Sequence, residues 1–440
     1  MLKLLLRQIE GRELLRRVIG NTTWLVADRL LRMLAGLLLS VWVARYLGPE
    51  GFGLLSFAIA FVALFTPIAD GGLQAIVVRD LVTRTESRKE ILASALALRL
   101  SGAVVAVALT AVCIWFMRPD SPSSRLIVMI VALSWLPQAF DVIDFDFQAR
   151  MQARPIIVLR MVSLLLFSAA KVAMILAHLP LLWFAVVVTA EAALSAILMW
   201  MLARRGGPEL RLGSASATEM RRLLAACWPM AVSSLSVMLY MRIDQVMLGQ
   251  MQGDKAVGVF SAAVRVSESW YFVPMAILTA VAPALTAAYA RSTADYLAKL
   301  MLFVRYMFWI AAAVAVLLSL TSGWLIPVLF GDGYLEAATV LAVHAWAGVF
   351  ASLGVATGPW FVNAGMLKFR MAHTVAGAVT NIAMNLYLIP HYGAVGAAVS
   401  TLVSYSMAAV LLNLLSRQTR PVFHIQLGSI FGGQRGLQYR

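Results

Sequence analysis

The stretch WLVADRLLRMLAGLLLSVW, residues 24–42, has the length and apolar content of a membrane-spanning helix, yet it contains Asp28, Arg29 and Arg32. A helix needs about 20 predominantly apolar residues to span a bilayer. Arg32 follows Thr22, the expected start of the span, by ten residues. At about 1.5 Å per residue it lies about 15 Å deep, near the midplane. Charges at that depth require a hydrated or protein-lined surface.

The composition places the whole chain in a membrane. Of its 440 residues, 61% are hydrophobic and only 13% are charged, which is too much apolar side chain for one soluble core. Apolar runs bounded by charge, Pro or Gly predict an all-α membrane protein with twelve transmembrane helices. The expected spans are residues 22–46, 52–78, 91–116, 126–147, 156–177, 181–202, 223–248, 258–290, 300–320, 337–362, 371–389 and 394–416.

The distribution of basic residues predicts the orientation. Segments expected inside the cell hold 24 Lys and Arg, whereas the outer loops hold 3, namely Arg118, Arg125 and Lys255. The positive-inside rule therefore predicts that both termini are cytoplasmic. The net charge of +15 arises from these alternating loops and not from a continuous basic patch, so we expect no nucleic-acid partner.

The loops are short, and no soluble catalytic domain fits between the spans. The expected divisions are an interfacial cytoplasmic helix (1–21), an N-terminal six-helix bundle (22–202), a cytoplasmic linker (203–222), a C-terminal six-helix bundle (223–416) and a cytoplasmic tail (417–440).

A weak internal repeat relates the two bundles. YLGPEGFGLLSFAIA (46–60) and MLGQMQGDKAVGVFSAAV (247–264) both read Leu-Gly, a turn, Gly, and Ser three residues later. Because six spans separate the two copies, the bundles share one orientation and are pseudo-symmetric about an axis along the membrane normal. Transporters built in this way place their substrate in a central cavity between the halves.

Several kinds of chemistry have no signature in the sequence. Cys113 and Cys227 both lie in apolar runs and the five histidines are scattered, so we predict neither a disulfide framework nor a metal site. There is also no G-x-x-x-x-G-K-[ST] phosphate loop, so energy for any transport must come from ions, the membrane potential or consumption of the product.

The predicted spans contain nine basic and eight acidic residues. At about 3 kcal/mol each, seventeen charges facing lipid would cost roughly 50 kcal/mol, so most must be paired, hydrated or near an interface. Arg45, Lys171, Asp144 and Asp146 lie within a turn or two of a span end, and we expect them to reach the interface. The other thirteen are Asp28, Arg29, Arg32, Asp70, Arg99, Asp141, Arg160, Glu191, Arg242, Asp244, Arg265, Glu268 and Arg305.

Some of these charges have an acidic or basic neighbour at helical spacing. Arg265 and Glu268, at i and i+3, can form a local salt bridge, as can Asp28 and Arg32 at i and i+4. Arg99, Arg242 and Arg305 have no such neighbour, and neither does Arg29. This excess of cationic groups suits an anionic ligand, because Arg is well matched to phosphate oxygens.

A helix break is expected late in the second span. FTPIADGGLQ (65–74) places Pro67 and two glycines around Asp70. The break either creates a cation site beside the carboxylate or is a simple capped helix end.

Five stretches of the sequence carry a family resemblance. They are ARYLGPEGFGLLSFA (44–58), IADGGLQAIVVRDL (68–81), DFDFQARMQARPI (144–156), RIDQVMLGQMQGDKAVGVFSAA (242–263) and NIAMNLYLIPHYGAVGAAVSTLVSY (381–405). Together they resemble the polysaccharide-biosynthesis flippases, the Wzx type of O-antigen transporter within the MOP exporter superfamily. The resemblance implies two six-helix lobes around a V-shaped central cavity. It implies alternating access in a bacterial inner membrane, often coupled to an H⁺ or Na⁺ gradient. The implied substrate is an undecaprenyl-diphosphate-linked oligosaccharide, moved from the inner to the outer leaflet.

Together, the resemblance and the charges give candidate residues for a transporter and none for catalysis, so we do not expect an enzyme. Tyr240 or Trp270 can stack on a sugar ring or serve as plain packing. The candidates for binding a diphosphate and acidic sugars are Arg29, Arg32, Arg99, Arg242, Arg265 and Arg305, and those for carrying a coupling cation or tuning the arginines are Asp28, Asp70, Asp244 and Glu268.

The expected partners are the lipid-linked oligosaccharide, membrane lipids and the polysaccharide polymerase machinery. Two other classes remain open. A multidrug or cation antiporter of the same superfamily would favour cavity carboxylates for cationic drugs. A membrane polysaccharide polymerase would need a sizeable outer loop or an acidic motif at the membrane surface, and the sequence has neither.

Overall fold

The computed structural model describes residue 33 and residues 35–205 and 212–431, and these residues are almost entirely helical. The candidate residues Asp28, Arg29 and Arg32, and the expected interfacial helix 1–21, lie outside the described residues. The helices are Ala35–Ala63, α2 (Thr66–Asp70), α3 (Leu73–Thr83), α4 (Arg88–Met117), α5 (Pro122–Ala132), α6 (Trp135–Gln138), α7 (Val142–Ala149), α8 (Ala153–Leu176), α9 (Leu181–Arg204), α10 (Ala217–Met251), α11 (Asp254–Glu268), α12 (Phe272–Arg291), α13 (Thr293–Phe330), α14 (Glu336–His344), α15 (Ala347–Asn363), α16 (Leu367–Ala409) and α17 (Arg420–Phe431).

Ten helical stretches among the described residues are long and apolar enough to cross a membrane, which makes this a multi-pass membrane protein. Two of the ten contain a glycine with positive φ, Gly48 at 68° and Gly393 at 54°. At Gly393 the chain of α16 doubles back. Gly396 then lies so close to Leu388 that a Cβ on Gly396 would overlap the Leu388 carbonyl oxygen. Each of these two stretches therefore contains parts of two predicted spans.

The break predicted around Asp70 is confirmed. α2 ends at Asp70, and Gly71 and Gly72 both adopt left-handed φ values before α3 begins. Only glycine adopts this conformation without strain. The Gly71 N–H donates to the carbonyl of Pro67, so the helix end is capped by its own backbone.

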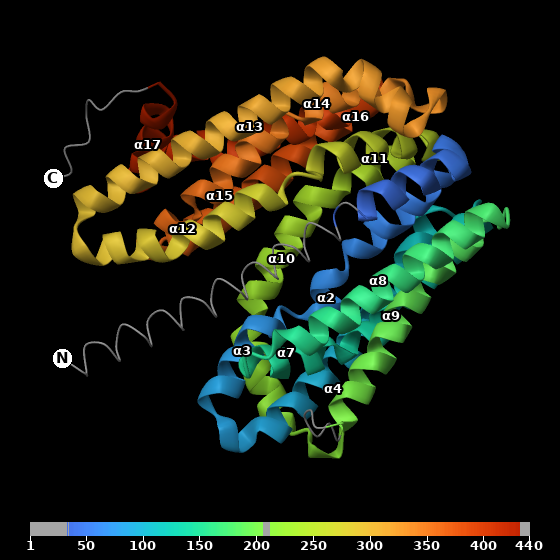
Figure 1. The fold of residues 1–440 in the computed structure, drawn as a ribbon, viewed down its shortest axis with the longest axis horizontal. Coiled ribbons are helices and arrows are strands. Elements are labelled where there is room, and N and C mark those ends of the chain that lie inside the picture. Colours follow the sequence, from blue (N-terminus) through green and yellow to red (C-terminus); the bar gives the residue numbers. More distant parts are fainter. Residues whose placement is uncertain (1–32, 34, 206–211, 432–440) are drawn as a thin grey trace, which may run out of the picture.

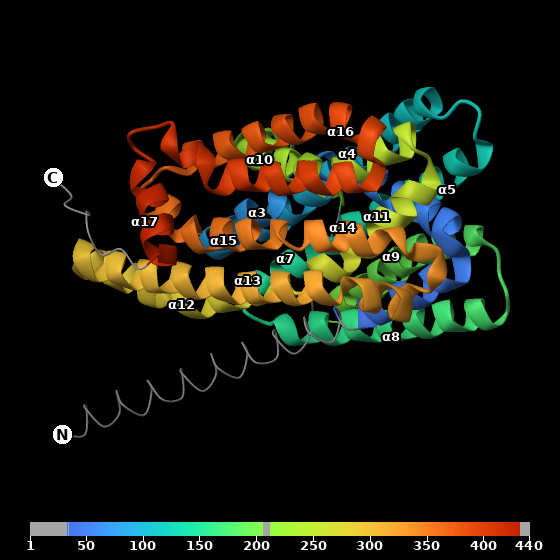
Figure 2. The same cartoon turned by 90° about the horizontal axis from the view of Figure 1, so that it is seen from above.

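The helices form two groups with α10 between them (Figure 1). The first group comprises Ala35–Ala63 and α2 to α9, and the second comprises α11 to α17. The N-terminal part of α10 packs against α3 and α4, where Leu223 and Cys227 join an apolar cluster with Leu73 and Leu81. Further along, α10 packs against α11 and α16. Figure 2 shows that the long helices of both groups run in a common direction.

The two groups touch at one end and separate at the other (Figure 1). At the contact, a Cβ on Gly53 would overlap the carbonyl of Asp254, and a Cβ on Gly258 would overlap that of Pro49. The backbones of the two groups therefore meet directly. These are the corresponding glycines of the internal repeat, and they lie beside loops predicted to be outside. We call the end of the molecule where the two groups touch the outer end, and the opposite end the inner end.

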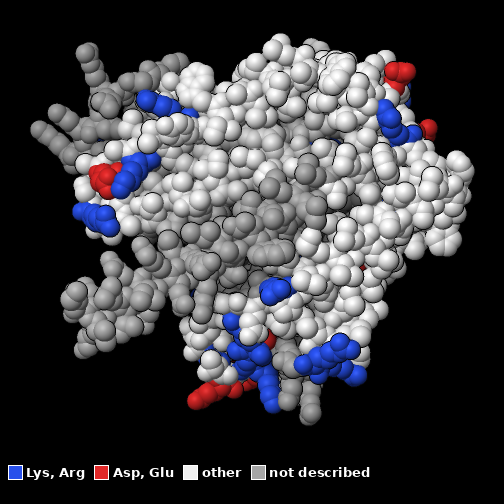
Figure 3. All heavy atoms as spheres, viewed as in Figure 1, with Lys and Arg blue, Asp and Glu red and all other residues white. Residues whose placement is uncertain are grey.

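Charged side chains gather at the ends of the molecule. Figure 3 shows Lys and Arg clustered at the tips of both groups, where Figure 1 places the α3–α4 and α12–α13 turns, and the described surface between them on this face is mostly uncharged. This arrangement agrees with the basic inner loops predicted from the sequence.

An ion cluster at the inner end fastens the start of α10 to the first group. Arg222 contacts Asp80 and Glu219, and Arg84 Nη1 lies 3.0 Å from Glu219. Burial alone would raise the pKa of the Asp80 carboxyl, but hydrogen bonds from Arg222 and Arg79 outweigh it and hold the pKa below its usual value. The ionised form of Asp80 therefore stabilises the fold.

We predict that Asp80→Asn lowers the free energy of unfolding by about 1–2 kcal/mol at neutral pH, because its partners are partly exposed and solvent weakens the pair. Asp80 has a lowered folded-state pKa, so its contribution is complete above the unfolded pKa of about 4 and is lost as the pH falls through the folded value. Thermal unfolding of the purified protein at several pH values measures both effects. Asp295→Asn, which breaks an exposed pair with Lys299, is the matched control with a change under about 0.5 kcal/mol.

Candidate functional site

A cavity of about 190 Å³ lies mainly within the first helix group, at its border with the second. Its walls come from Ala35–Ala63, α8 and α9 of the first group, and Arg265 of α11 closes it from the second. Lys171 of α8 also lines it, together with Ser40 and Ser168. We call this space the central cavity; two basic side chains from opposite groups converge on it.

Among the described residues that line it, the central cavity carries a net positive charge. Lys171 Nζ lies 3.3 Å from the carboxylate of Glu191, so that charge is neutralised locally. Arg265 is exposed to the cavity and has no ion pair within 4.0 Å among the described residues. An unpaired guanidinium in a helical membrane protein is costly unless water or an anion contacts it. Arg265 therefore provides the free cationic group of this site.

The alternative of a local Arg265–Glu268 bridge is not what the structure contains. Glu268 instead faces Arg242 of α10, at 3.8 Å. Asp244, two residues after Arg242, points in another direction and contacts α16. Residues two apart on a helix lie on different faces, so α10 presents one charge to α11 and another to α16.

Arg99 is not a free cation. Its guanidinium lies 2.8 Å from Asp70 and 5.5 Å from the ring centroid of Phe145, and the residue is only 7% exposed. Its partner stands in α2, so no helical spacing could indicate the pair. Asp70, at the helix break, neutralises an arginine of the same group.

Asp244 is buried among neutral hydrogen-bonding groups. Thr401 Oγ1 lies 2.6 Å from one carboxylate oxygen, and Asn385 Nδ2 donates to the other at 2.5 Å. Asn385 contacts Asn381 in turn, while the amide oxygen Oδ1 of Asn385 is buried without any partner. Asp244 has no ion pair within 4.0 Å among the described residues. A buried carboxylate of this kind requires a compensating proton or cation.

Arg305 lies away from the central cavity. Its Nε donates to the carbonyl of Ser429 at 2.8 Å, which fastens α17 to α13. In this structure the side chain holds the C-terminal helix.

The expectation that the acidic residues Asp144 and Asp146 reach the interface was wrong. Both are buried, at 5% and 0% exposure. Asp144 pairs with Arg160 at 2.7 Å, and Asp146 pairs with Arg88 and Arg150. Arginines supplied by neighbouring helices and loops neutralise them, so these carboxylates have no need to reach water.

A clamp at the outer end was not predicted from the sequence. Arg118, counted only as an outer-loop charge, lies 2.8 Å from Asp254 and donates to the carbonyl of Gly249 at 2.8 Å. Its Nε also donates to the side-chain oxygen Oε1 of Gln250, and Nε2 of Gln250 donates to the carbonyl of Met117. These contacts join the α4–α5 turn to the α10–α11 turn. Their only sequence signal is the position of Arg118 in an outer loop.

The sequence and the fold both match known proteins. The sequence profile of the polysaccharide biosynthesis protein family matches residues 18–289, more than half of the chain. The chain belongs to that family. The MatE profile matches residues 229–387. No curated protein matches the chain by sequence.

Three solved structures have a similar fold. The inward-facing conformation of a multidrug resistance MATE family transporter of the MOP superfamily aligns with a TM-score of 0.72 at 16% identity, covering 89% of this chain and 95% of that one. The lipid II flippase MurJ in an inward closed conformation aligns with a TM-score of 0.67 at 12% identity, covering 92% and 90%. A MOP superfamily transporter from Pyrococcus furiosus aligns with a TM-score of 0.63 at 16% identity, covering 92% and 96%. This member of the polysaccharide biosynthesis family thus has the MOP transporter fold, and these matches are transporters and a flippase, not enzymes.

We predict that Arg118→Gln opens the outer end. Losing hydrogen bonds from a charged group costs about 1.5–3 kcal/mol, which shifts the ratio of closed to open molecules by about 10- to 100-fold. Spin labels at positions 120 and 332, one in an outer loop of each group, report the change as a longer distance distribution in double electron–electron resonance.

Arg125→Gln is the matched control, because Arg125 is also an outer basic residue but stacks on Trp115 within its own group. An unchanged distance distribution in Arg118→Gln, or an equal change in Arg125→Gln, would contradict the clamp.

Proposed function

We propose that this protein moves an undecaprenyl-diphosphate-linked oligosaccharide from the inner to the outer leaflet of a bacterial inner membrane for surface polysaccharide biosynthesis. Family membership and the MOP fold support a transporter of this class. The observation that carries the proposal is that Arg265, which has no ion pair among the described residues, lines the central cavity together with Lys171.

The cargo explains why such a cavity is needed. A diphosphate and its sugars cannot cross hydrocarbon, whereas the polyprenyl tail can remain in lipid throughout. Guanidinium groups bind phosphate oxygens through charge-assisted hydrogen bonds, which strengthen where water is scarce. Arg265 supplies such a group, and the neighbouring Arg242–Glu268 pair can exchange partners when an anion enters.

The arrangement of the two groups supports alternating access. The outer end is closed by the glycine contact between Gly53 and Gly258 and by the Arg118 clamp, while the groups separate toward the inner end. Cargo would enter from the inner leaflet in this state. Release requires the outer contacts to break and the inner ends to approach. In this proposal the chain has twelve spans in two six-helix bundles, with both termini in the cytoplasm.

We also propose that the coupling cation, H⁺ or Na⁺, binds at Asp244. The residues that would hold Na⁺ offer oxygen atoms only: the carboxylate of Asp244, the hydroxyl of Thr401 and the amide oxygens of Asn381 and Asn385. Oxygen ligands suit hard cations, and the orphaned Oδ1 of Asn385 is an unused acceptor within this set. A bound cation would neutralise the buried carboxylate where α10 meets both halves of α16.

To test the cargo site, we compare flipping of a lipid-linked oligosaccharide by wild-type and Arg265→Gln protein in proteoliposomes. Losing one charge-assisted contact to the diphosphate lowers the rate by about tenfold or more. Lys255→Gln removes a charge from the same helix at the exposed outer end and leaves the rate unchanged. Full activity in Arg265→Gln at equal protein incorporation would falsify the cationic-cavity mechanism.

A gradient experiment tests the coupling site. Wild-type protein flips faster when an inward Na⁺ or H⁺ gradient is imposed, and the effective gradient identifies the ion. Asp244→Asn keeps the gradient-independent rate and loses the stimulation. Glu336→Gln, which removes an exposed acid at the outer end, retains it. Equal stimulation of Asp244→Asn and wild type would place the coupling elsewhere.

A multidrug or cation antiporter is the second candidate, because the MatE profile and the MATE structure also match. The unpaired cation of the central cavity opposes it, since a cationic drug would be repelled by Arg265. Drug resistance conferred by expression in a sensitive bacterial strain, together with unaltered surface polysaccharide in a deletion strain, would favour the antiporter.

A further inference from the structure

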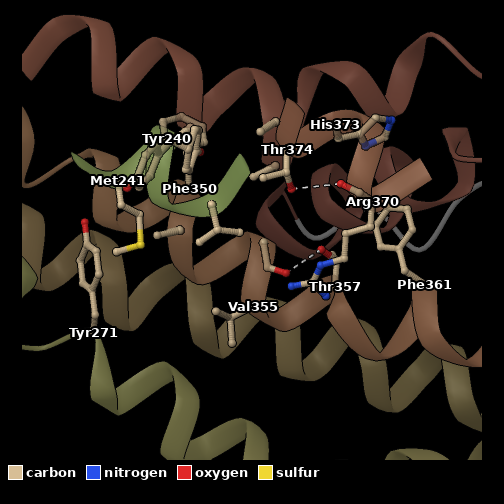
Figure 4. Close-up of a pocket in the computed structure, with 16 residues that line it drawn as sticks. Tyr240, Met241, Tyr271, Phe350, Val355, Thr357, Phe361, Arg370, His373 and Thr374 are labelled. Carbon is tan, nitrogen blue, oxygen red and sulfur yellow. Dashed lines mark hydrogen bonds between the residues drawn. The ribbon is translucent and has the colours of Figure 1, made fainter. Parts of the chain in front are cut away.

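A second cavity, of about 270 Å³, lies inside the second helix group. Its described lining comes from α10, α15, α16 and the turn before α12, and no described residue of the first group takes part (Figure 4). We call it the C-terminal cavity. It shares no described lining residue with the central cavity.

Arg370 is the one Lys, Arg, Asp or Glu among the described residues that line the C-terminal cavity. Its guanidinium has no ion pair or hydrogen bond among the described residues. The group lies against the backbone of α15 at Gly358, where a Cβ would overlap its Nη1 atom. Figure 4 shows the side chain directed toward Thr357. The absence of a side chain at position 358 therefore lets this free cation lie along the cavity wall.

A buried hydroxyl stands at the opposite side of the C-terminal cavity. The Tyr271 hydroxyl has no hydrogen-bond partner within 3.5 Å among the described residues. Figure 4 shows Tyr271 and Arg370 on opposite sides of the space. A buried hydroxyl without a partner costs about 1–3 kcal/mol, so an occupant that accepts a hydrogen bond there is favoured.

The remaining lining is aromatic and apolar. Tyr240 and Tyr405 stack with ring centroids 4.2 Å apart, and Phe350, Phe361 and His373 complete the aromatic surface. The volume of about 270 Å³ lies just below the roughly 300–1,000 Å³ of pockets for drug-sized ligands. A single ring with polar substituents matches this size.

These features distinguish between classes of ligand. A cation would be repelled by Arg370, because no acid balances it. A purely apolar chain would leave the Tyr271 hydroxyl without a hydrogen-bond partner and would place no anion at Arg370. We propose that the C-terminal cavity binds an anionic sugar of monosaccharide size, with its phosphate or carboxylate at Arg370 and a ring hydroxyl at Tyr271. The sugar comes either from the glycan of a lipid-linked cargo or from a free sugar phosphate at the inner end.

Binding to the full-length protein in phosphatidylcholine nanodiscs tests this proposal by calorimetry. The probes are glucose 1-phosphate, glucuronate, glucose and inorganic phosphate. We expect saturable binding of the two anionic sugars, at least about tenfold tighter than glucose, which lacks the charge-assisted contact to Arg370, and tighter than inorganic phosphate, which lacks the contacts of the sugar ring. No saturable binding of either anionic sugar, or equal binding of inorganic phosphate, would overturn the proposal.

Variants locate the binding site. Arg370→Gln weakens binding by about 10- to 100-fold, and Tyr271→Phe by less than about tenfold, because the first removes a charged donor and the second a neutral one. Gly358→Ala displaces the end of a flexible side chain without altering the bundle, and it weakens binding as well. Lys368→Gln, which removes another basic residue two positions away, leaves binding unchanged.

An equal loss in Lys368→Gln and Arg370→Gln would show general electrostatic attraction and overturn the site. Competition by a polyprenyl-diphosphate-linked glycan indicates the cargo as the source of the sugar, and its absence indicates a free sugar phosphate. The result is separable from the proposed function, because sugar binding at Arg370 is measured without flipping and Arg265→Gln leaves it intact.

Discussion

An ionised group inside an apolar helix bundle must find a partner or water, and the structure follows from this constraint. Arg99 meets Asp70, Asp144 meets Arg160, and Asp146 meets Arg88. Each pair joins different helices or turns, so neutralising the charges also fixes how the helices pack. The groups without a partner are then informative. Arg265 and Arg370 have none among the described residues, and each lines a cavity.

Direct backbone contact at the outer end sets the relation between the two groups. Glycines at equivalent positions of the internal repeat, Gly53 and Gly258, let the chains approach until a Cβ would overlap a carbonyl. A contact between glycines can form closely and release without rotamer changes, which suits an interface that opens in the proposed transport cycle. The Arg118 clamp adds ionic contacts to this geometry, and water can replace them.

α10 connects these features because its faces serve different neighbours. Arg242 turns toward Glu268 on α11, while Asp244 and Tyr240 turn toward α16. Tyr240 stands one helical turn before Asp244, so the C-terminal cavity and the buried carboxylate share the contact between α10 and α16. A change at either place acts on the helix that also packs on the first group through α3 and α4.

The sequence by itself determined the membrane class, the approximate spans, the helix break at Asp70 and the equivalence of Gly53 and Gly258, because these depend on local composition, spacing and repetition. It also identified most of the charges that matter, since a charge within an apolar run is visible without a structure. Only the tertiary structure decided their roles. Arg99 pairs with Asp70 of another helix, Arg305 holds α17, and Arg118 closes the outer end. Partners separated by tens to hundreds of residues leave no spacing to read, and whether a guanidinium is neutralised or free depends on which helix folds against it.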